Sequence, residues 1–320
     1  MRSLSIPRHP VRDLRAICAV LLAAALPFAL GCDDTVNPII ESDRRFSLFA
    51  TLDMNSDQQM LRVIPIRETI LEDPGALQVE VRSVDLTNGI ERTWRDSILT
   101  FPDGLVAHIF VTQLRLESQH RYRLEVLENG VVVTFAETTI PLRPMAVIQP
   151  VQIRTGSSGF VATQRVRWYD LPEIPFEVTY WYRFYSYRSN RFENVLMPHV
   201  PGSAPSTEHP GSRDFYIDLN ADRAVLDKEY SSWRFDPFVG IGMTIVLLDD
   251  AFVPPGGKFD RDILSQPGAF TNVTGGFGFV GSVGRFSTEW VMADSTARQL
   301  GYRPLGGALK AELEARMANQ

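Results

Sequence analysis

The chain has 320 residues, of which 44% are hydrophobic and 22% charged, so it can bury a sizeable core and is not a disordered protein. Its formal net charge at pH 7 is −6. A nucleic-acid partner would require a basic face. Docking on anionic lipid headgroups would require a polybasic segment. The acidic net charge argues against both kinds of partner.

The N-terminal segment is typical of an export signal. Residues 1–31 begin with four arginines and continue with a charge-free apolar run, Ala16 to Leu30. This run is shorter than the roughly 20 apolar residues that span a bilayer. A basic start, an apolar centre and a small-residue cleavage site together indicate a secretory signal peptide. Cys32 follows directly, and its position resembles that of the lipidated cysteine in the bacterial lipobox.

Two processing routes fit this junction. Ala29 and Leu30 depart from the lipobox, which has Leu and then Ala or Ser at these positions, and the sequence up to Gly31 also suits an ordinary secreted protein. The only other cysteine, Cys18, lies in the segment that would be removed, so no disulfide pair remains. We therefore expect Cys32 to be lipidated and the chain to be held on a membrane through this anchor.

The rest of the chain is more acidic than the whole. Removal of residues 1–31 takes away four arginines and one aspartate, which changes the net charge from −6 to −9. Residues 32–43 are acidic and lack an apolar pattern, so we expect them to form a tether between the anchor and the folded part.

Residues 44–142 show the period-two alternation of strands with one buried face and one exposed face. The clearest example is His120 to Val126, and Asn129-Gly130 after it favours a type I′ hairpin. Seven strands are expected, over Phe46–Leu52, Met60–Ile66, Leu77–Val81, Arg92–Leu99, Leu105–Val111, His120–Val126 and Val131–Glu137. This number predicts an immunoglobulin-like β-sandwich. The run YRLEV, the hairpin and the final TTIP resemble the last strands of fibronectin type III modules.

Three prolines between residues 141 and 150 indicate a boundary after Leu142, so residues 143–320 are expected to form a second β-rich domain. Its predicted strands are Gln164–Tyr169, Phe176–Tyr187, Phe238–Leu248 and the glycine-rich stretch Asn272–Met292. Helices are expected over Asn220–Tyr230, with Asn220 as the cap, over Ala293–Leu300 and over Gly307–Ala318 at the C-terminus. Pro201–Arg213 is predicted to be an exposed, mobile loop.

Four short motifs along the chain resemble a family of bacterial envelope lipoproteins that is known only as a domain of unknown function and is frequently encoded beside TonB-dependent receptors. They are His120–Val126, Val166–Asp170, Tyr180–Tyr182 and Asn272–Gly281. The first departs from the family, because Gln119 stands where the family has glycine. The resemblance implies a lipid anchor in the outer membrane, on its periplasmic or its surface side, an N-terminal sandwich and a place beside an outer-membrane transporter. It carries over no catalytic residue.

Catalytic and cofactor motifs are sparse. Gly276–Gly281 matches G-x-G-x-x-G, but a dinucleotide site needs a helix after the glycines, and here a strand or turn continues. Close backbone packing explains these glycines better. His108, His120, His199 and His209 lack metal-ligand spacing, and no G-x-S-x-G occurs, so no metal, cofactor or nucleophile is predicted.

Three aspartates offer an alternative. Asp249 and Asp250 with Asp260 could bind calcium or act as paired carboxylates in the cleavage of a glycosidic bond. Solvated acids at the end of a strand are the ordinary interpretation, and too few further oxygen ligands can be placed for a calcium site.

The best candidate for a binding surface is aromatic. If Phe176–Tyr187 is a single strand, Trp181, Arg183, Tyr185 and Tyr187 share one face. Rings with polar tips favour surfaces that are partly dry and partly wet, as at interfaces and sugar-binding platforms. The alternative is that both faces of this strand are covered and the rings fill the core.

These observations predict a mostly β, lipid-anchored envelope protein with a binding or assembly role and no cofactor. Its expected partner is a TonB-dependent receptor or a glycan or peptide ligand. Two alternatives remain: an envelope hydrolase acting on glycan or peptide, and a purely structural lipoprotein. An enzymatic role is less expected than a non-enzymatic one.

Overall fold

The computed structural model describes residues 43–66, 77–100, 106–156, 159–252 and 271–307. The signal peptide, Cys32, the tether up to Ser42, Asp260 and all but the first residue of the predicted helix Gly307–Ala318 lie outside the described residues, so these predictions remain predictions. The described residues belong to one unit of the chain, Asp43–Gln320.

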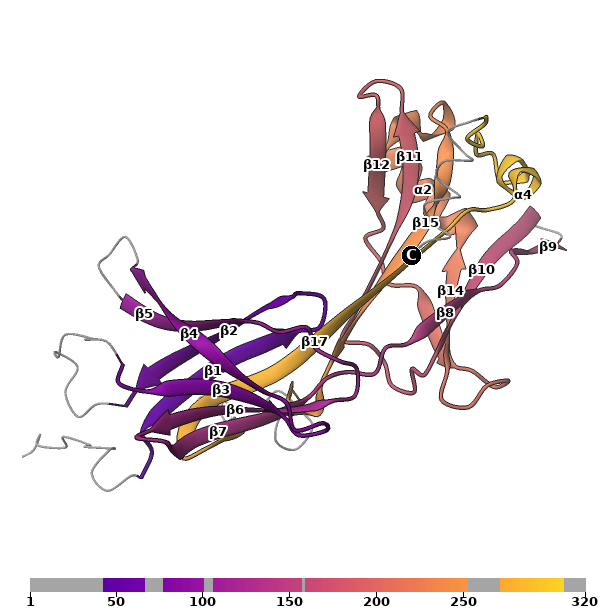
Figure 1. Ribbon diagram of the computed structural model, residues 1–320. Helices are drawn as coiled ribbons and strands as arrows, with labels where there is room; N and C mark the ends of the chain where they lie inside the picture. The colour runs from indigo at the N-terminus through magenta and orange to yellow at the C-terminus, as the bar shows by residue number, and fades with distance from the viewer. Residues whose placement is uncertain (1–42, 67–76, 101–105, 157–158, 253–270, 308–320) are drawn as a thin grey trace, which may run out of the picture. The chain divides into compact units, whose positions relative to one another are not determined.

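A strand is present near each of the seven places predicted in the first part of the chain, and the fold is mostly β, as expected (Figure 1). The third strand begins at Glu80 and not at Leu77. The bounds of the seven strands are β1 (Phe46–Asp53), β2 (Gln58–Pro65), β3 (Glu80–Asp85), β4 (Glu91–Thr100), β5 (Val106–Gln113), β6 (Arg121–Glu128) and β7 (Val131–Thr139). Alternation sets the core: Phe46, Leu48 and Leu52 of β1 are buried, whereas the residues between them are partly or fully exposed. The hairpin between β6 and β7 has the positive φ angles at Asn129 and Gly130 that a type I′ turn requires.

The strands form two layers that share β4. The N-terminal half of β4, Glu91–Trp94, pairs with β3, and the C-terminal half, Arg95–Thr100, pairs with β5. One layer therefore has the order β17-β1-β2-β5-β4, and the other has the order β4-β3-β6-β7-β16. Buried apolar side chains from both layers, among them Leu61, Val81 and Leu124, belong to the same core.

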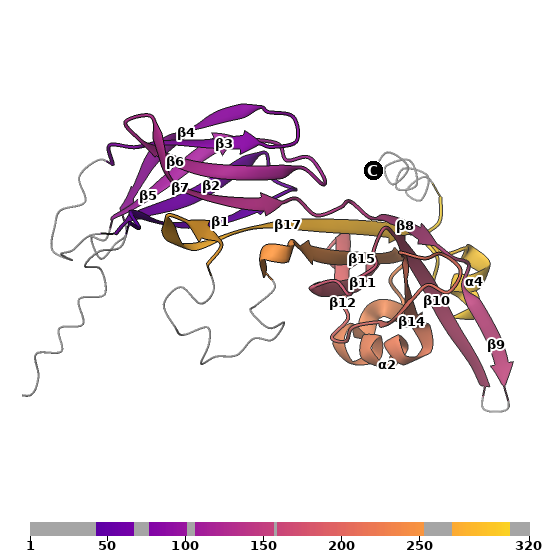
Figure 2. The same cartoon turned by 90° about the horizontal axis from the view of Figure 1, so that it is seen from below.

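The strand β17 (Gly276–Trp290) joins the two parts of the sheet (Figure 2). Its N-terminal half runs parallel to β1, from Phe46↔Gly276 to Asp53↔Val283, and its C-terminal half runs antiparallel to β15 (Phe238–Leu248). The short strand β16 (Val273–Thr274) adds to β7. Residues 44–142 thus lack two strands of their own sandwich, and the predicted boundary after Leu142 does not divide the sheet.

The glycines of β17 allow close backbone contact, as predicted for Gly276–Gly281. A Cβ on Gly276 or Gly278 would overlap the carbonyl oxygen of Phe46 or Leu48, and Gly278 has a φ of +103°. Because β17 continues to Trp290, no helix follows these glycines, which excludes the geometry of a dinucleotide fold at this motif.

The later strands build the far end of this sheet and a second, smaller one. β11 (Glu177–Ser186) lies between β15 and the edge strand β12 (Arg191–Leu196). The second sheet has the order β13-β14-β10-β8, with β9 also paired to β10. Its strands are β8 (Met145–Ile148), β9 (Gln152–Gly156), β10 (Gly159–Tyr169), β13 (Gly202–Pro205) and β14 (Arg213–Asp218). The prediction of a loop over Pro201–Arg213 was wrong in part, because β13 falls within it and Ser206 and Ser212 are buried.

The helices are short. α2 (Leu219–Glu229) matches the predicted helix, but its cap is Asp218, whose carboxylate accepts hydrogen bonds from the backbone N–H groups of Asn220 and Ala221. Asn220 instead accepts a hydrogen bond of 2.6 Å from the backbone N–H of Ala162, which ties α2 to β10. The remaining helices are α4 (Asp294–Gln299) and the 3₁₀ turns η1 (Ser231–Arg234) and η2 (Asp250–Phe252). Within the described part of the chain, every helix is too short or too polar to cross a bilayer.

Candidate functional site

The strand β11 has two distinct faces. Val178, Tyr180, Tyr182 and Phe184 are buried, whereas the alternating residues Thr179, Trp181, Arg183 and Tyr185 are only half-buried. The common face predicted for Trp181, Arg183 and Tyr185 is therefore present, and Tyr187 follows just beyond the strand as an exposed residue. We call this surface, together with Phe192 and Leu196 of β12, the aromatic platform. That it binds a ligand stays a prediction.

Trp181 lies over a glycine of the neighbouring strand. Gly242 of β15 is its partner in the antiparallel register, and a Cβ on Gly242 would overlap the indole ring. The indole Nε1 is shielded from solvent and has no hydrogen-bond partner among the described residues. The ring thus covers backbone that a glycine leaves bare, which gives Trp181 a structural role in addition to any binding role.

Arg183 is held in an ion pair across the sheet. Its Nη1 lies 2.5 Å from Oε2 of Glu289 on β17, and its Nε donates to Oδ1 of Asn194 at 2.8 Å. On the intervening strand β15, Gly240 lies opposite Arg183 and Gly242 lies opposite Glu289, so β15 places no side chain at either position. The positive charge predicted for the platform is therefore already balanced within the protein, and recognition there would rest on the rings.

Tyr185 anchors the outer end of the platform. Its hydroxyl donates to Oδ1 of Asn190, and its ring meets those of Phe192 and Tyr187 edge to face, at centroid distances of 5.3 and 5.8 Å. The guanidinium of Arg303 lies 5.6 Å from the centre of the Tyr187 ring. These contacts orient the rings before any partner arrives.

The aspartates predicted as an alternative site come partly together. Asp249 and Asp250 both line a pocket of about 690 Å³ beside Thr139, Ile174 and Phe176. Asp249 is buried, and one carboxylate oxygen accepts from the Thr138 hydroxyl, whereas the other has no partner among the described residues. Burial raises the pKa of Asp249. Asp260 lies outside the described residues, so the trio stays a prediction.

The histidines lie apart from one another. His108 contacts Asp96, His120 contacts Asp85 and Glu117, His199 contacts Asp222, and His209 lies against the Tyr169 ring. In the described segments, no three His, Cys, Asp or Glu side chains are grouped closely enough to hold a metal ion.

Sequence analysis missed a buried polar network on the inner face of β11. Asp222 of α2 is fully buried and accepts hydrogen bonds from the hydroxyls of Tyr182, at 2.6 Å, and Tyr180, at 2.9 Å. His199 Nε2 lies 2.9 Å from the same carboxylate and is the one member with a half-exposed side chain. Burial raises the pKa of Asp222. The signal was available, because buried tyrosine hydroxyls need a partner, but the partner is 40 residues away.

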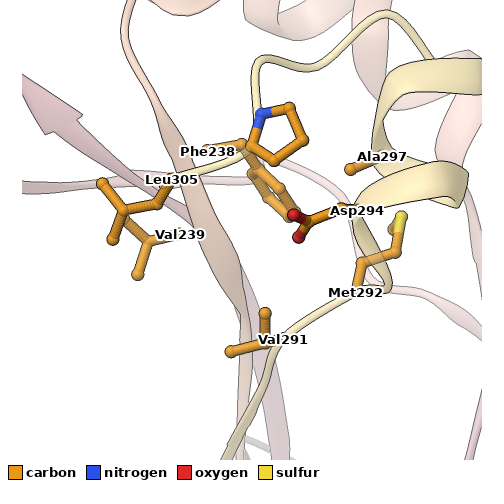
Figure 3. A pocket seen from close by; sticks show the side chains of 8 residues that line it. Phe238, Val239, Val291, Met292, Asp294, Ala297 and Leu305 are labelled. Atoms are coloured by element: carbon orange, nitrogen blue, oxygen red, sulfur yellow. The ribbon is translucent and has the colours of Figure 1, made fainter. Parts of the chain in front are cut away.

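A second cavity is too small to be a ligand site. Its volume is about 10 Å³, and Phe238, Met292, Asp294 and Leu305 are among the side chains around it (Figure 3). A space of this size holds at most one water molecule. It is a gap in the packing between β15 and α4.

No protein-family model and no curated protein matches this chain. The arguments about function therefore rest on the geometry of the aromatic platform and of the pockets.

Proposed function

We propose that the protein is a lipid-anchored protein of the outer membrane that binds or assembles a partner through the aromatic platform, as an accessory to an outer-membrane transporter such as a TonB-dependent receptor. The supporting observation is that the platform rings are held in place by the protein and yet remain half-exposed. Tyr and Trp are enriched at the centres of protein interfaces.

The position of the platform at a sheet edge supports a protein partner. β12 ends the order of the large sheet, so among the described residues its outer side pairs with no further strand. Leu196, which lies beside Trp181 in the register, is 61% exposed. An open edge offers backbone hydrogen bonds to an added strand, and neighbouring side chains supply the specificity.

Specific observations favour two other functions. Asp249 and Asp250 line the same pocket, and two neighbouring carboxylates favour a hydrolase acting on glycan or peptide. The cover that Trp181 gives to Gly242 suits a purely structural role. The rings could also stack on a glycan or a peptide instead of a receptor.

Site-specific cross-linking would test the proposal in native membranes. A photo-reactive amino acid at Leu196 is compared with one at Met145, which has the same exposed fraction of 61% but lies on β8, the edge of the other sheet. If the platform binds a transporter, adducts with an outer-membrane protein should form from position 196 and not from position 145. Trp181→Ala should reduce them at unchanged protein level.

Two results would contradict the proposal. Identical adducts from Leu196 and Met145 would show that the contact is not specific to the platform. A full yield of adducts from Leu196 in the Trp181→Ala background would show that the rings do not contribute to binding.

A further inference from the structure

The outer face of the first sheet carries a groove of about 760 Å³. It lies across β17, β1, β2, β5 and β4, which are consecutive in the sheet. The antiparallel register sets two rows of side chains across this face: Phe49, Arg62, Ile109 and Ser97 in one, and Met60, Val111 and Arg95 in the other. We call it the arginine groove.

The apolar content of the arginine groove is unusual for the outer face of a sandwich. An antiparallel sheet with one face on the core normally presents polar side chains to solvent on the other. Here Phe49, Met60 and Leu99 line the groove and are 45%, 60% and 48% exposed, and Ile109 and Val111 lie half-buried between them. Contiguous exposed apolar surface of this kind marks sites of interaction.

Two cations accompany this apolar surface and have no acidic partner among the described residues. Arg62 on β2 and Arg95 on β4 are exposed, and neither forms an ion pair within the described residues. The third arginine, Arg285, is paired with Asp53 at 2.7 Å. From strand spacing, the Cα atoms of Arg62 and Arg95 are about 12 Å apart, so both long side chains can reach one anion between them. The whole chain has a net charge of −6. The groove is locally positive, because Arg62 and Arg95 form no ion pair among the described residues.

The end of the groove is rigid. Gln59 is buried, and its side-chain amide donates to the carbonyl oxygens of Asp53, at 2.9 Å, and Ser56, at 2.8 Å, while its own oxygen accepts from the Asp53 N–H. These bonds fix the turn between β1 and β2, from which Asp53 reaches Arg285. The groove is therefore already formed in the free protein.

We propose that the arginine groove binds a single anionic amphiphile, with an acyl chain along Phe49 and Met60 and its carboxylate or phosphate head between Arg62 and Arg95. The volume of about 760 Å³ lies within the roughly 300–1,000 Å³ of small-molecule sites. Arginine suits such heads, because its planar guanidinium donates two parallel hydrogen bonds to carboxylate or phosphate oxygens. The inference is independent of the aromatic platform.

Calorimetric titration with three amphiphiles of one chain length tests the proposal. Dodecanoate, dodecyltrimethylammonium and dodecyl maltoside are each added below their micelle concentrations to the folded protein. We expect dodecanoate to bind with one site per chain and the cationic amphiphile not to bind. Arg62→Gln and Arg95→Gln should each weaken dodecanoate binding about fivefold, the upper range for an exposed ion pair.

The matched control is Arg154→Gln on β9, an exposed arginine without an ion pair among the described residues and outside the groove. It should leave affinity unchanged, and thermal unfolding should confirm that all three variants fold. Equal affinity for the three amphiphiles, or equal effects of Arg62→Gln and Arg154→Gln, would overturn the proposal. So would binding to phosphatidylglycerol vesicles without binding of dodecanoate, because that would make the groove a membrane-docking surface.

Discussion

Trp181 and Gly242 should be strongly coupled in stability. A fully packed tryptophan buries about 150–250 Å². A half-buried indole therefore removes roughly 100 Å² from water, which at about 25 cal/mol per Å² corresponds to about 2.5 kcal/mol lost in Trp181→Ala. Gly242→Ala should cost about 1–3 kcal/mol, because the new Cβ overlaps the indole and forces it off the sheet.

The double variant is the informative one. Once the indole is gone, the Cβ at residue 242 meets empty space, and alanine within a strand is more stable than glycine by about 0.5–1 kcal/mol. The cycle should therefore give a coupling of about 1.5–4 kcal/mol, well above the value for independent sites. Urea denaturation of the four proteins measures it.

Gly240 supplies the control for this cycle. A Cβ on Gly240 would overlap the backbone carbonyl oxygen of Trp290, which the loss of Trp181 does not move. Gly240→Ala should therefore be equally destabilising with and without Trp181. If Gly242→Ala and Trp181→Ala simply add, the indole does not lie over Gly242 in solution, and the account of the platform fails.

Further predictions concern the anchor, the sheet and two buried acids. Cys32→Ala should release the protein into the soluble fraction or leave uncleaved precursor, since two or more acyl chains are needed for stable attachment; wild-type protein that mass spectrometry finds free of lipid would rule the anchor out. The fragment 43–140 lacks β16 and β17, so it should show no cooperative thermal transition, whereas addition of these strands through a linker should restore one; cooperative unfolding of the shorter fragment would refute this. The hydrogen bond to Asp85 raises the pKa of His120, so their stabilising interaction is fully present below the unfolded pKa of about 6.5 and is lost as pH rises through the folded value. The difference in stability between wild type and His120→Ala, from urea titrations, should thus shrink between acidic and alkaline pH. Burial raises the pKa of Asp222, so the contribution of Asp222 to the free energy of unfolding is fully present below about pH 3.9 and is lost as pH rises through the higher folded pKa. Asp222→Asn should therefore flatten the dependence of stability on pH between these two pKa values. An unchanged slope in this range would contradict the prediction.

Alternation in the sequence predicted the strands whose faces differ in polarity, and it failed where buried residues are charged. Sequence analysis predicted no strand over β14, which begins with Arg213 and Asp214. Both are buried: Arg213 donates to the carbonyl oxygens of Pro172 and Glu173, and Asp214 receives two hydrogen bonds from the buried Arg167. A charged residue looks solvent-exposed until its partner is known, and these partners lie at least 40 residues away.

The strand that completes the first sandwich was not identified from the sequence, for a related reason. The prolines after Thr139 do mark a change in direction, but β17, more than 130 residues later, supplies the strand beside β1. Its glycines suggested close backbone packing and did not identify the neighbour. A parallel pair leaves no hairpin signal, because its two strands are not joined by a short turn.

At the aromatic platform, too, the sequence did not reveal the partners that lie far away along the chain. Period two correctly assigned Trp181, Arg183 and Tyr185 to one face, because side-chain direction along a strand is a local property. How far each is buried depends on what lies opposite. Gly242 allows the indole to lie flat on the sheet, and Gly240 leaves Arg183 free to reach Glu289. The half-exposure on which the binding proposal rests therefore depends on two glycines of β15. In the sequence they belong to the apolar run FVGIGMTIVLL and indicate only a buried strand.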